Sequence, residues 1–479
     1  MLHALSLALL QVPAIPASTV PRSNRFGAAV ASAGDVNEDG VPDLWVGDPL
    51  RSAPTEPSAG RAWCVSGKDG STLLCISAPP GSREYGWTLA GLGDVDGDGV
   101  RDVAVGCMQA DARDAESDKS AFASSESAVH VHSGRDGALK VVVRGAGEQL
   151  KFGWYSSGAG PALANVGDWN EDGADDLAIG WSYADGDLQD QGRVQVVSGR
   201  DGSTLHEWLG LEHHDRFGFA LARVADVDGD GRGELAASAV PDQDGRSPSD
   251  ALQRTRSGYV RLLSSKNGTL RTIHAVDGSR FFGFSLAAFP RNAGGGVDGV
   301  IVGQAHDWNA SYVVTRWNLS DGSKAQLATR PPLTAWDGGS EYSNSIFPPR
   351  TEVDVSFATC VLAVPDRDGD GQADVLVTEP QAFCGIPAGV ISSKPSKPSR
   401  ASDSLAAVPL GRVELGDLGV EYSHVGIACC TTGDVDGDGV EDFVVSGCSI
   451  RYPGCTGTVN VVSGKTLKLL STYTRPGRE

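Results

Sequence analysis

The chain is poor in positive charge and has no long apolar segments. Its 479 residues include 40 Lys and Arg against 61 Asp and Glu, which gives a formal net charge of −21 at pH 7. A nucleic acid or an anionic membrane requires a cationic face on its partner, so this balance argues against both. No segment beyond the N-terminus reaches the ~18 consecutive apolar residues that a transmembrane helix needs. We therefore expect no membrane span.

Motifs that mark common enzyme classes are also absent. The sequence has no Gly-x-Ser-x-Gly, no His-Glu-x-x-His and no phosphate-binding glycine-rich loop. His130 and His132 alternate along one expected strand, and His213-His214 lie in an expected loop. Such histidines are more often structural or solvated than catalytic. Because a fold does not fix a function, the question of catalysis stays open at this point.

Glycine is abundant, with 62 residues in the chain, and its distribution follows a sevenfold repeat. Each repeat opens with an aromatic-Gly pair or a degenerate form of it, continues as an apolar strand, and passes through an Asp-rich turn into a second apolar strand. The openings are Phe26-Gly27, Tyr85-Gly86, Phe152-Gly153, Phe217-Gly218, Phe282-Gly283, Phe357-Ala358 and Val425-Gly426. The turns begin at Asp35, Asp94, Asp168, Asp226, Asp366 and Asp434, with Pro290 at the equivalent place in the fifth repeat.

Each repeat predicts four antiparallel strands. Apolar residues alternate after the turns, as in Leu44 and Val46, and a third strand follows, as in residues 192–197. A Ser-Gly-x-Asp-Gly turn then leads into a fourth strand, and Asp-Gly between two strands is a strong hairpin signal. Seven such units predict an all-β fold, a seven-bladed β-propeller of four-stranded antiparallel blades, over residues 25–475. Residues 1–17 are apolar and uncharged and are typical of a signal peptide, which indicates a secreted, extracellular or periplasmic protein.

The Asp-rich turns have the pattern of a site for a hard cation. Side-chain oxygens recur at positions 1, 3, 5 and 9, Gly at position 6 permits the sharp turn, and the carbonyl of position 7 can point inward. Calcium accepts six to eight oxygens in irregular geometry, whereas magnesium prefers water and a strict octahedron. The sequence thus predicts up to six Ca²⁺ ions, held by Asp35, Asn37, Asp39, Val41 and Asp43; Asp94, Asp96, Asp98, Val100 and Asp102; Asp168, Asn170, Asp172, Ala174 and Asp176; Asp226, Asp228, Asp230, Arg232 and Glu234; Asp366, Asp368, Asp370, Gln372 and Asp374; and Asp434, Asp436, Asp438, Val440 and Asp442.

Two other interpretations of these turns fit less well. An EF-hand requires Glu at position 12, and here that position holds Val46, Val105, Ile179, Ala237, Val377 and Val445. A single Asp-Gly turn needs no metal, but six in register bring several carboxylates together, which is repulsive without a cation. The fifth repeat has Pro290, Asn292, Gly294 and Asp298 at the ligand positions. We expect that blade to close without metal.

These repeats resemble a known family. The aromatic-Gly openings followed by Gly-Asp-Val-Asp-Gly-Asp-Gly, at residues 93–99 and 433–439, are similar to the FG-GAP repeats of the integrin alpha-subunit propeller. The resemblance covers nearly the whole mature chain and implies seven blades with calcium between strands 1 and 2. The Gly-Ala-Pro element is weak here, as in Gly47-Asp48-Pro49, and six candidate sites exceed the usual integrin number. No Asp-x-Ser-x-Ser motif occurs, so an inserted adhesion domain is not expected.

The connections 2→3 and 4→1 are long and irregular, and they share the face opposite the Asp-rich turns. Variable loops on a rigid scaffold commonly form binding sites. This face therefore predicts a binding or adhesion module for an extracellular protein or carbohydrate. Two alternatives stay open, a calcium-assisted polysaccharide lyase or hydrolase and a purely structural surface protein. The long connections are residues 107–128, 181–191, 241–257, 323–356, 379–387 and 395–420, and their aromatic residues include Trp181, Tyr183, Trp308, Trp336, Tyr342 and Tyr452.

The nine cysteines give modest support for an oxidising compartment. Cys64 and Cys75 flank Asp69-Gly70 symmetrically, so a hairpin turning there would place them opposite each other at a separation that suits a disulfide. Cys448 and Cys455 bracket one loop of the last repeat and form a second candidate pair. The sequence pairs none of the other cysteines.

Overall fold

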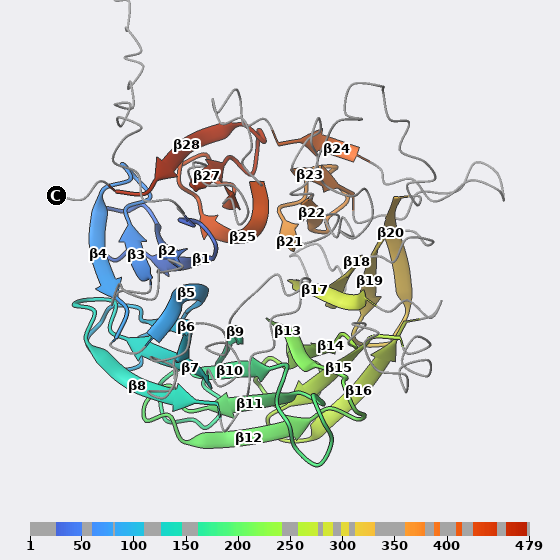
Figure 1. Cartoon of the computed structure of the whole chain (residues 1–479). Helices are drawn as coiled ribbons and strands as arrows, with labels where there is room; N and C mark the ends of the chain where they lie inside the picture. The colour runs from blue at the N-terminus through green and yellow to red at the C-terminus, as the bar shows by residue number, and fades with distance from the viewer. Residues whose placement is uncertain are drawn as a thin grey trace, which may run out of the picture.

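The computed structural model describes residues 25–49, 60–79, 82–109, 126–145, 161–241, 257–275, 281–290, 298–305, 312–330, 360–378, 388–392, 409–413, 425–447 and 457–476. These residues form 28 strands in seven four-stranded sheets, and every sheet follows the chain order of its own strands. All strand pairs inside the sheets are antiparallel. Figure 1 shows the sheets as blades arranged in a ring. The predicted seven-bladed β-propeller is confirmed.

Blades 1 to 4 contain sixteen of the strands. Their bounds are β1 (Val30–Gly34), β2 (Asp43–Asp48), β3 (Arg61–Val65), β4 (Thr72–Ser77), β5 (Ser82–Gly91), β6 (Val103–Gln109), β7 (Glu126–His132), β8 (Leu139–Arg144), β9 (Ala162–Gly167), β10 (Asp176–Trp181), β11 (Arg193–Val197), β12 (Thr204–Leu209), β13 (Phe217–Arg223), β14 (Leu235–Ala239), β15 (Tyr259–Ser264) and β16 (Gly268–His274).

Blades 5 to 7 contain the other twelve. Their bounds are β17 (Phe281–Phe289), β18 (Gly299–Ala305), β19 (Tyr312–Asn318), β20 (Lys324–Arg330), β21 (Val361–Val364), β22 (Asp374–Thr378), β23 (Ala388–Ile391), β24 (Pro409–Arg412), β25 (Val425–Gly433), β26 (Asp442–Gly447), β27 (Thr458–Val462) and β28 (Leu469–Thr474). Within the described ranges, no helix has the length and apolar character needed to cross a membrane.

The hydrophobic core is divided among the seams between blades. Seven buried clusters each contain residues of two adjacent blades, and together they cover all seven seams. In β2, Leu44 and Val46 pack against blade 7, whereas Trp45 between them packs against blade 2. The second strand of a blade is buried on both faces, so its alternate residues pack into the two seams on either side of the blade.

Four described aromatic-Gly pairs pack their blades against the preceding ones. Phe26, Tyr85, Phe217 and Phe282 are all buried in seam clusters. Gly218 has φ +88°, and a Cβ atom on it would lie 2.7 Å from the carbonyl oxygen of Arg193 in blade 3. Because a side chain would meet backbone, only Gly fits this close approach. The pairs at 152–153 and 357–358 lie outside the described residues.

The ring closes without strand exchange, since each blade is built from four consecutive strands. β25 of the last blade lies beside β1 of the first (Figure 1). The Tyr473 hydroxyl donates a hydrogen bond to the Gly67 carbonyl (2.7 Å), and Arg475 Nε lies 2.9 Å from Oδ2 of the buried Asp48. Tyr473 in the last strand and Arg475 just after it thus hold blade 7 against blade 1.

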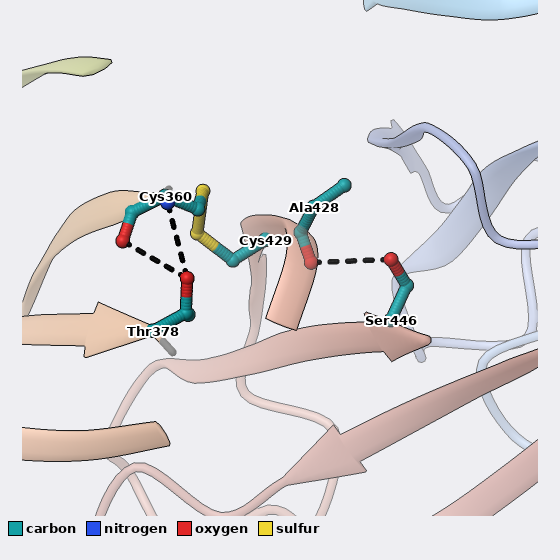
Figure 2. The surroundings of a disulfide bond; sticks show 5 residues. All are labelled: Cys360, Thr378, Ala428, Cys429 and Ser446. Atoms are coloured by element: carbon teal, nitrogen blue, oxygen red, sulfur yellow. Dashed lines mark hydrogen bonds between the residues drawn. A yellow bond between two sulfur atoms is a disulfide. The ribbon is translucent and has the colours of Figure 1, made fainter. Parts of the chain in front are cut away.

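The observed disulfide joins Cys360 and Cys429, 69 residues apart, at the seam between blades 6 and 7 (Figure 2). The predicted Cys64–Cys75 bond is wrong, because both thiols are free. The turn is centred on Lys68-Asp69, where the Ser66 N–H donates to the Ser71 carbonyl at 2.9 Å. Even with a β-bulge after Cys64, Cys64 therefore pairs with Leu74 and Cys75 pairs with Trp63. A shift of one residue moves a side chain to the other face of the sheet. Cys448 and Cys455 lie outside the described residues.

Candidate metal centres and the loop face

All six Asp-rich loops connect strands 1 and 2 of a blade and adopt one hydrogen-bonding pattern. In blade 2 the Asp94 carboxylate accepts hydrogen bonds from the N–H groups of Gly97 (2.7 Å), Asp98 (3.0 Å) and Gly99 (2.7 Å). The bond from position 6 to position 1 recurs in the other five loops. The position-1 carboxylate therefore organises the turn.

The residue at position 9 anchors the loop to the blade. Asp102 directly precedes β6 of blade 2 and has no exposed surface, and its carboxylate accepts the N–H groups of Val95 (2.8 Å) and Gly134 (2.8 Å). Burial, together with the nearby carboxylates Asp96 and Asp98, raises the pKa of Asp102 to about 6. Burial likewise raises the pKa of Glu234 to about 7. Negative charge is costly at this position, which favours a cation beside it.

Four loops bring acidic ligand atoms within 4.8 Å of one another. Loops 2, 6 and 7 unite the carboxylates at positions 1, 3 and 9, and loop 4 adds position 5. Such sets of oxygens suit a hard cation. The clusters are Asp94, Asp96 and Asp102; Asp366, Asp368 and Asp374; Asp434, Asp436 and Asp442; and Asp226, Asp228, Asp230 and Glu234.

Loops 1 and 3 share the turn but differ at position 3. Asn37 and Asn170 each donate a side-chain N–H to the position-5 carboxylate, at 3.1 Å and 2.8 Å, and accept the N–H of position 5 at 3.0 Å. These loops therefore carry fewer carboxylates than the other four. In all six loops the N–H of position 7 donates to the position-5 carboxylate, from Val41, Val100, Ala174, Arg232, Gln372 and Val440.

Position 4 is a structural determinant that the sequence analysis missed. It is Gly97, Gly229, Gly369 and Gly437 in four loops, with φ between +75° and +80°, and Glu38 and Glu171 in the others, with φ +59° and +63°. A left-handed residue is therefore required between positions 3 and 5. In the sequence, the recurrent Gly at position 4 indicates this left-handed conformation.

The 3→4 turns also reach these loops, which the sequence analysis did not predict. Ser133 and Ser198 donate side-chain hydrogen bonds to the position-5 carboxylates Asp98 (3.0 Å) and Asp172 (3.1 Å). Arg135 and Arg200 of the same turns lie 3.5 Å and 3.4 Å from those carboxylates. The position-5 carboxylates of loops 2 and 3 are thus paired with protein cations, whereas positions 1 and 9 are satisfied by backbone N–H groups.

The fifth repeat is only partly described. Pro290 directly follows β17, and residues 291–297, which include Asn292 and Gly294, lie outside the described residues. The carbonyl oxygen of Asp298 accepts the N–H of Leu319 at 3.0 Å. The metal-free fifth blade stays a prediction.

Neighbouring loops contact each other around part of the ring. The Asp175 carboxylate of loop 3 accepts the N–H of Gly93, next to loop 2, at 2.8 Å. Trp169 of loop 3 donates its indole N–H to the Gly233 carbonyl of loop 4 at 3.1 Å, and Glu171 forms an ion pair with Arg232. Loops 2, 3 and 4 thus form a continuous contact chain on one face of the propeller.

Two of the aromatic residues expected to be exposed on the opposite face, Trp181 and Tyr183, are buried. Trp181 is 2% exposed and donates its indole N–H to Gln195 Oε1 at 2.9 Å. Tyr183 is 7% exposed, and the Arg216 guanidinium lies 4.7 Å from its ring centre. Both side chains therefore pack within the blades. Trp308, Trp336, Tyr342 and Tyr452 lie outside the described residues.

His130 and His132 are buried between blades 1 and 2. His132 Nδ1 lies 2.9 Å from the Gly137 carbonyl and must donate to it, so its Nε2 accepts from the Tyr85 hydroxyl at 2.7 Å. Burial lowers the pKa of His130 to about 4, and His132 and Arg144 add to this effect. The burial of His130 and His132 fits the interpretation that these two histidines have a structural role.

No family model matches the chain. Integrin alpha-4 of Xenopus laevis is 32% identical over 163 residues, which is 33% of this chain and 14% of that protein. Integrin alpha pat-2 of Caenorhabditis elegans is 38% identical over 93 residues, 18% of this chain and 7% of that protein. The alignments thus span only a small part of these relatives.

Among solved structures, the Kuenenia stuttgartiensis hydrazine synthase aligns with 91% of this chain and 96% of its own, at a TM-score of 0.43 and 11% identity. The rhamnogalacturonan lyase YesW aligns with 95% of this chain and 69% of its own, at a TM-score of 0.33 and 14% identity. These similarities are too weak to indicate a function. The seven blades, the aromatic-Gly repeats and the partial identity to integrin alpha chains make this β-propeller similar to the FG-GAP propeller of the integrin alpha subunits.

Proposed function

We propose that this protein is a secreted, calcium-binding β-propeller that acts as a binding or adhesion module through its long-loop face. The observation that carries the proposal is the convergence of acidic oxygens in four loops of identical design. Two further loops keep the same turn with Asn at position 3. Up to six Ca²⁺ would be held by the oxygens at positions 1, 3, 5, 7 and 9.

Calcium would contribute mainly to stability. Each loop connects the two inner strands of a blade, and its position-9 carboxylate reaches the 3→4 turn, as Asp102 reaches Gly134. An ion bound by positions 1, 3 and 9 would therefore hold three of the four strands at one end of the blade. Oxygen-only donor sets favour calcium or magnesium, and irregular protein-only coordination favours calcium.

Metal content tests this part of the proposal. Protein would be dialysed into medium buffered at ~1 μM Ca²⁺, about 100-fold below a Kd of ~10⁻⁴ M, and then titrated with Ca²⁺ to ~1 mM in a calorimeter. We expect several bound Ca²⁺ per chain, and one fewer in Asp94→Asn/Asp102→Asn. Asp321→Ala, in an exposed turn of blade 5, is the matched control and should leave the count unchanged. The absence of calcium binding would contradict the proposal.

Secretion rests on two observations. Residues 1–17 have the composition of a signal peptide, and the Cys360–Cys429 bond is typical of an oxidising compartment. Expression of the full chain in a secreting host should release protein into the medium or periplasm. Its N-terminal sequence should begin shortly after residue 17. Recovery only from the cytoplasm with an intact Met1 would refute this part.

The proposed partner is an extracellular protein or carbohydrate. Similarity to integrin alpha chains supports a protein partner. Immobilised protein would be probed with extracellular-matrix proteins and with polysaccharides, in calcium. Retention without product indicates a binding module, and cleavage of the polysaccharide would favour the lyase or hydrolase alternative. Retention of neither would favour a purely structural role.

A further inference from the structure

The Asp-rich loops differ in the protein cations that contact them. In loop 2, Nζ of Lys140, a residue of β8, lies 2.7 Å from Oδ2 of the position-3 residue Asp96. Arg135 of the 3→4 turn lies 3.5 Å from Oδ2 of the position-5 residue Asp98, and its guanidinium also donates to the Asp98 carbonyl. Two protein cations therefore contact two of the carboxylates of loop 2.

Loop 4 has the larger acidic cluster but no such cation. The carboxylate of its position-3 residue, Asp228, accepts hydrogen bonds from the neutral side chains of Ser264 (2.6 Å) and Asn267 (2.8 Å). Arg232, at position 7, instead forms an ion pair with Glu171 of loop 3. Within the described ranges, no Lys or Arg side chain forms an ion pair with any of the four carboxylates of this cluster.

The contact between Lys140 and position 3 is particular to blade 2 among the described 3→4 turns. Lys140 lies three residues after Gly137, the left-handed residue of its turn. Arg271, at the equivalent place in blade 4, is directed at Gly322 in the next 3→4 turn, where a Cβ atom would lie 2.1 Å from its Nη1. The other equivalent residues in the described turns are uncharged: Leu73, Leu205, Ala325 and Leu470.

The ion pair in loop 2 is partly shielded from water. The side chains of Lys140 and Asp96 are 35% and 14% exposed. Water and salt weaken exposed pairs most, so this pair acts more strongly than one on an open surface. The ammonium also reduces the repulsion among Asp94, Asp96 and Asp102, whose ligand atoms lie within 4.8 Å of one another. The chain itself therefore neutralises part of the charge of loop 2.

We propose that Lys140 is a resident cation of loop 2 that competes with calcium, so that loop 4 fills at a lower calcium concentration than loop 2. The ammonium and an ion bound by Asp96 would share one carboxylate, and like charges that close repel each other. Loop 2 would lose its calcium first and still keep a cation at position 3. This inference rests on the proposed calcium binding and concerns the regulation of those sites.

Calorimetric titration with CaCl₂ tests the competition. Lys140→Met keeps the length of the side chain and removes its charge, so calcium should bind loop 2 at least ~5-fold more tightly. Lys140→Arg keeps the charge and should bind like the wild type. The binding step of loop 2 is the one that Asp94→Asn/Asp102→Asn removes, and in that background Lys140→Met should change nothing.

Lys266→Met is the matched control. Lys266 is exposed in the 3→4 turn of blade 4 and forms no ion pair with loop 4, so its replacement should leave the affinity of loop 4 unchanged. Melting temperatures give a second measurement. In excess chelator Lys140→Met should melt below the wild type, and calcium should raise its melting temperature by more than it raises that of the wild type. A merely structural role would lower both melting temperatures equally.

The outcomes separate this inference from the proposed function. A wild type that binds no calcium contradicts the proposed function. A wild type that binds calcium, with the affinity of loop 2 unchanged or weakened in Lys140→Met, overturns only the competition. Filling of loop 2 before loop 4 also overturns it. If Lys140→Met does not fold in chelator, Arg135→Gln removes the second cation of loop 2 and should likewise strengthen calcium binding there. Unchanged or weaker binding in that variant would refute the inference.

Discussion

Removal of the Cys360–Cys429 disulfide should destabilise the propeller at one particular seam. Blade 7 opens with Val425-Gly426 in place of an aromatic-Gly pair, and the disulfide crosses the same seam. A cross-link between residues 69 apart restricts the unfolded chain by about 4 kcal/mol in the chain-entropy treatment. With an unfolding entropy of roughly 2.1 cal/mol/K per residue, the about 300 described residues convert this loss into a melting temperature about 6 °C lower.

The double variant Cys360→Ala/Cys429→Ala would be compared with the wild type by calorimetry and by guanidinium denaturation. Cys430→Ala is the control, because Cys430 directly follows Cys429 in the chain but forms no disulfide and packs into the seam with blade 1. Reductant should lower the wild-type melting temperature to that of the double variant and leave the double variant unchanged. A loss below about 1 kcal/mol, or an equal loss in Cys430→Ala, would refute the reasoning that the bond restricts the unfolded chain.

Three further predictions follow from calcium, charge and ring closure. Chelation should lower the melting temperature by about 13 °C, since six sites with Kd ~10⁻⁴ M at ~1 mM Ca²⁺ contribute about 1.4 kcal/mol each; scanning calorimetry in excess chelator checks this, and an unchanged melt contradicts it. His130 has its pKa lowered to about 4 by burial, so the unfolded state takes up a proton first as the pH falls below about 6.5. Stability should therefore fall by up to about 3 kcal/mol between about pH 6.5 and about pH 4, and urea titrations should show a flatter profile for His130→Gln. Arg475→Ala removes the cation paired with the buried Asp48 carboxylate, leaves only the weaker influence of Arg61, and should cost about 3 kcal/mol. The exposed Lys468→Ala on the same blade should be neutral, and equal denaturation midpoints would exclude this role.

The fold could be predicted because local signals recur at equivalent places. An aromatic-Gly pair such as Phe217-Gly218 marks a seam between blades, and its spacing to the Asp-rich turn fixes the first strand. The turns themselves were also predictable, since Asp at position 1 organises the loop through its own backbone, as Asp94 does. Repeated motifs of this kind can be recognised in a single sequence.

Features that depend on register or on distant segments could not be predicted. The Cys64–Cys75 prediction failed because the turn is centred on Lys68-Asp69, one residue earlier than the predicted Asp69-Gly70. The observed partner of Cys429 is 69 residues away in another blade, and no local pattern identifies it. Trp181 was expected on the loop face, but it is the last residue of β10 and points into the seam with blade 2.

Noncovalent closure between blades 7 and 1 means that the position of the chain ends is incidental to the ring. Every blade is continuous in sequence, so the described chain begins and ends at a seam like the six others. Linking the ends and cutting the chain between other blades should give circular permutants of the same architecture. A cut between blades 6 and 7 would form a special case, because Cys360–Cys429 would still join the two new terminal blades covalently.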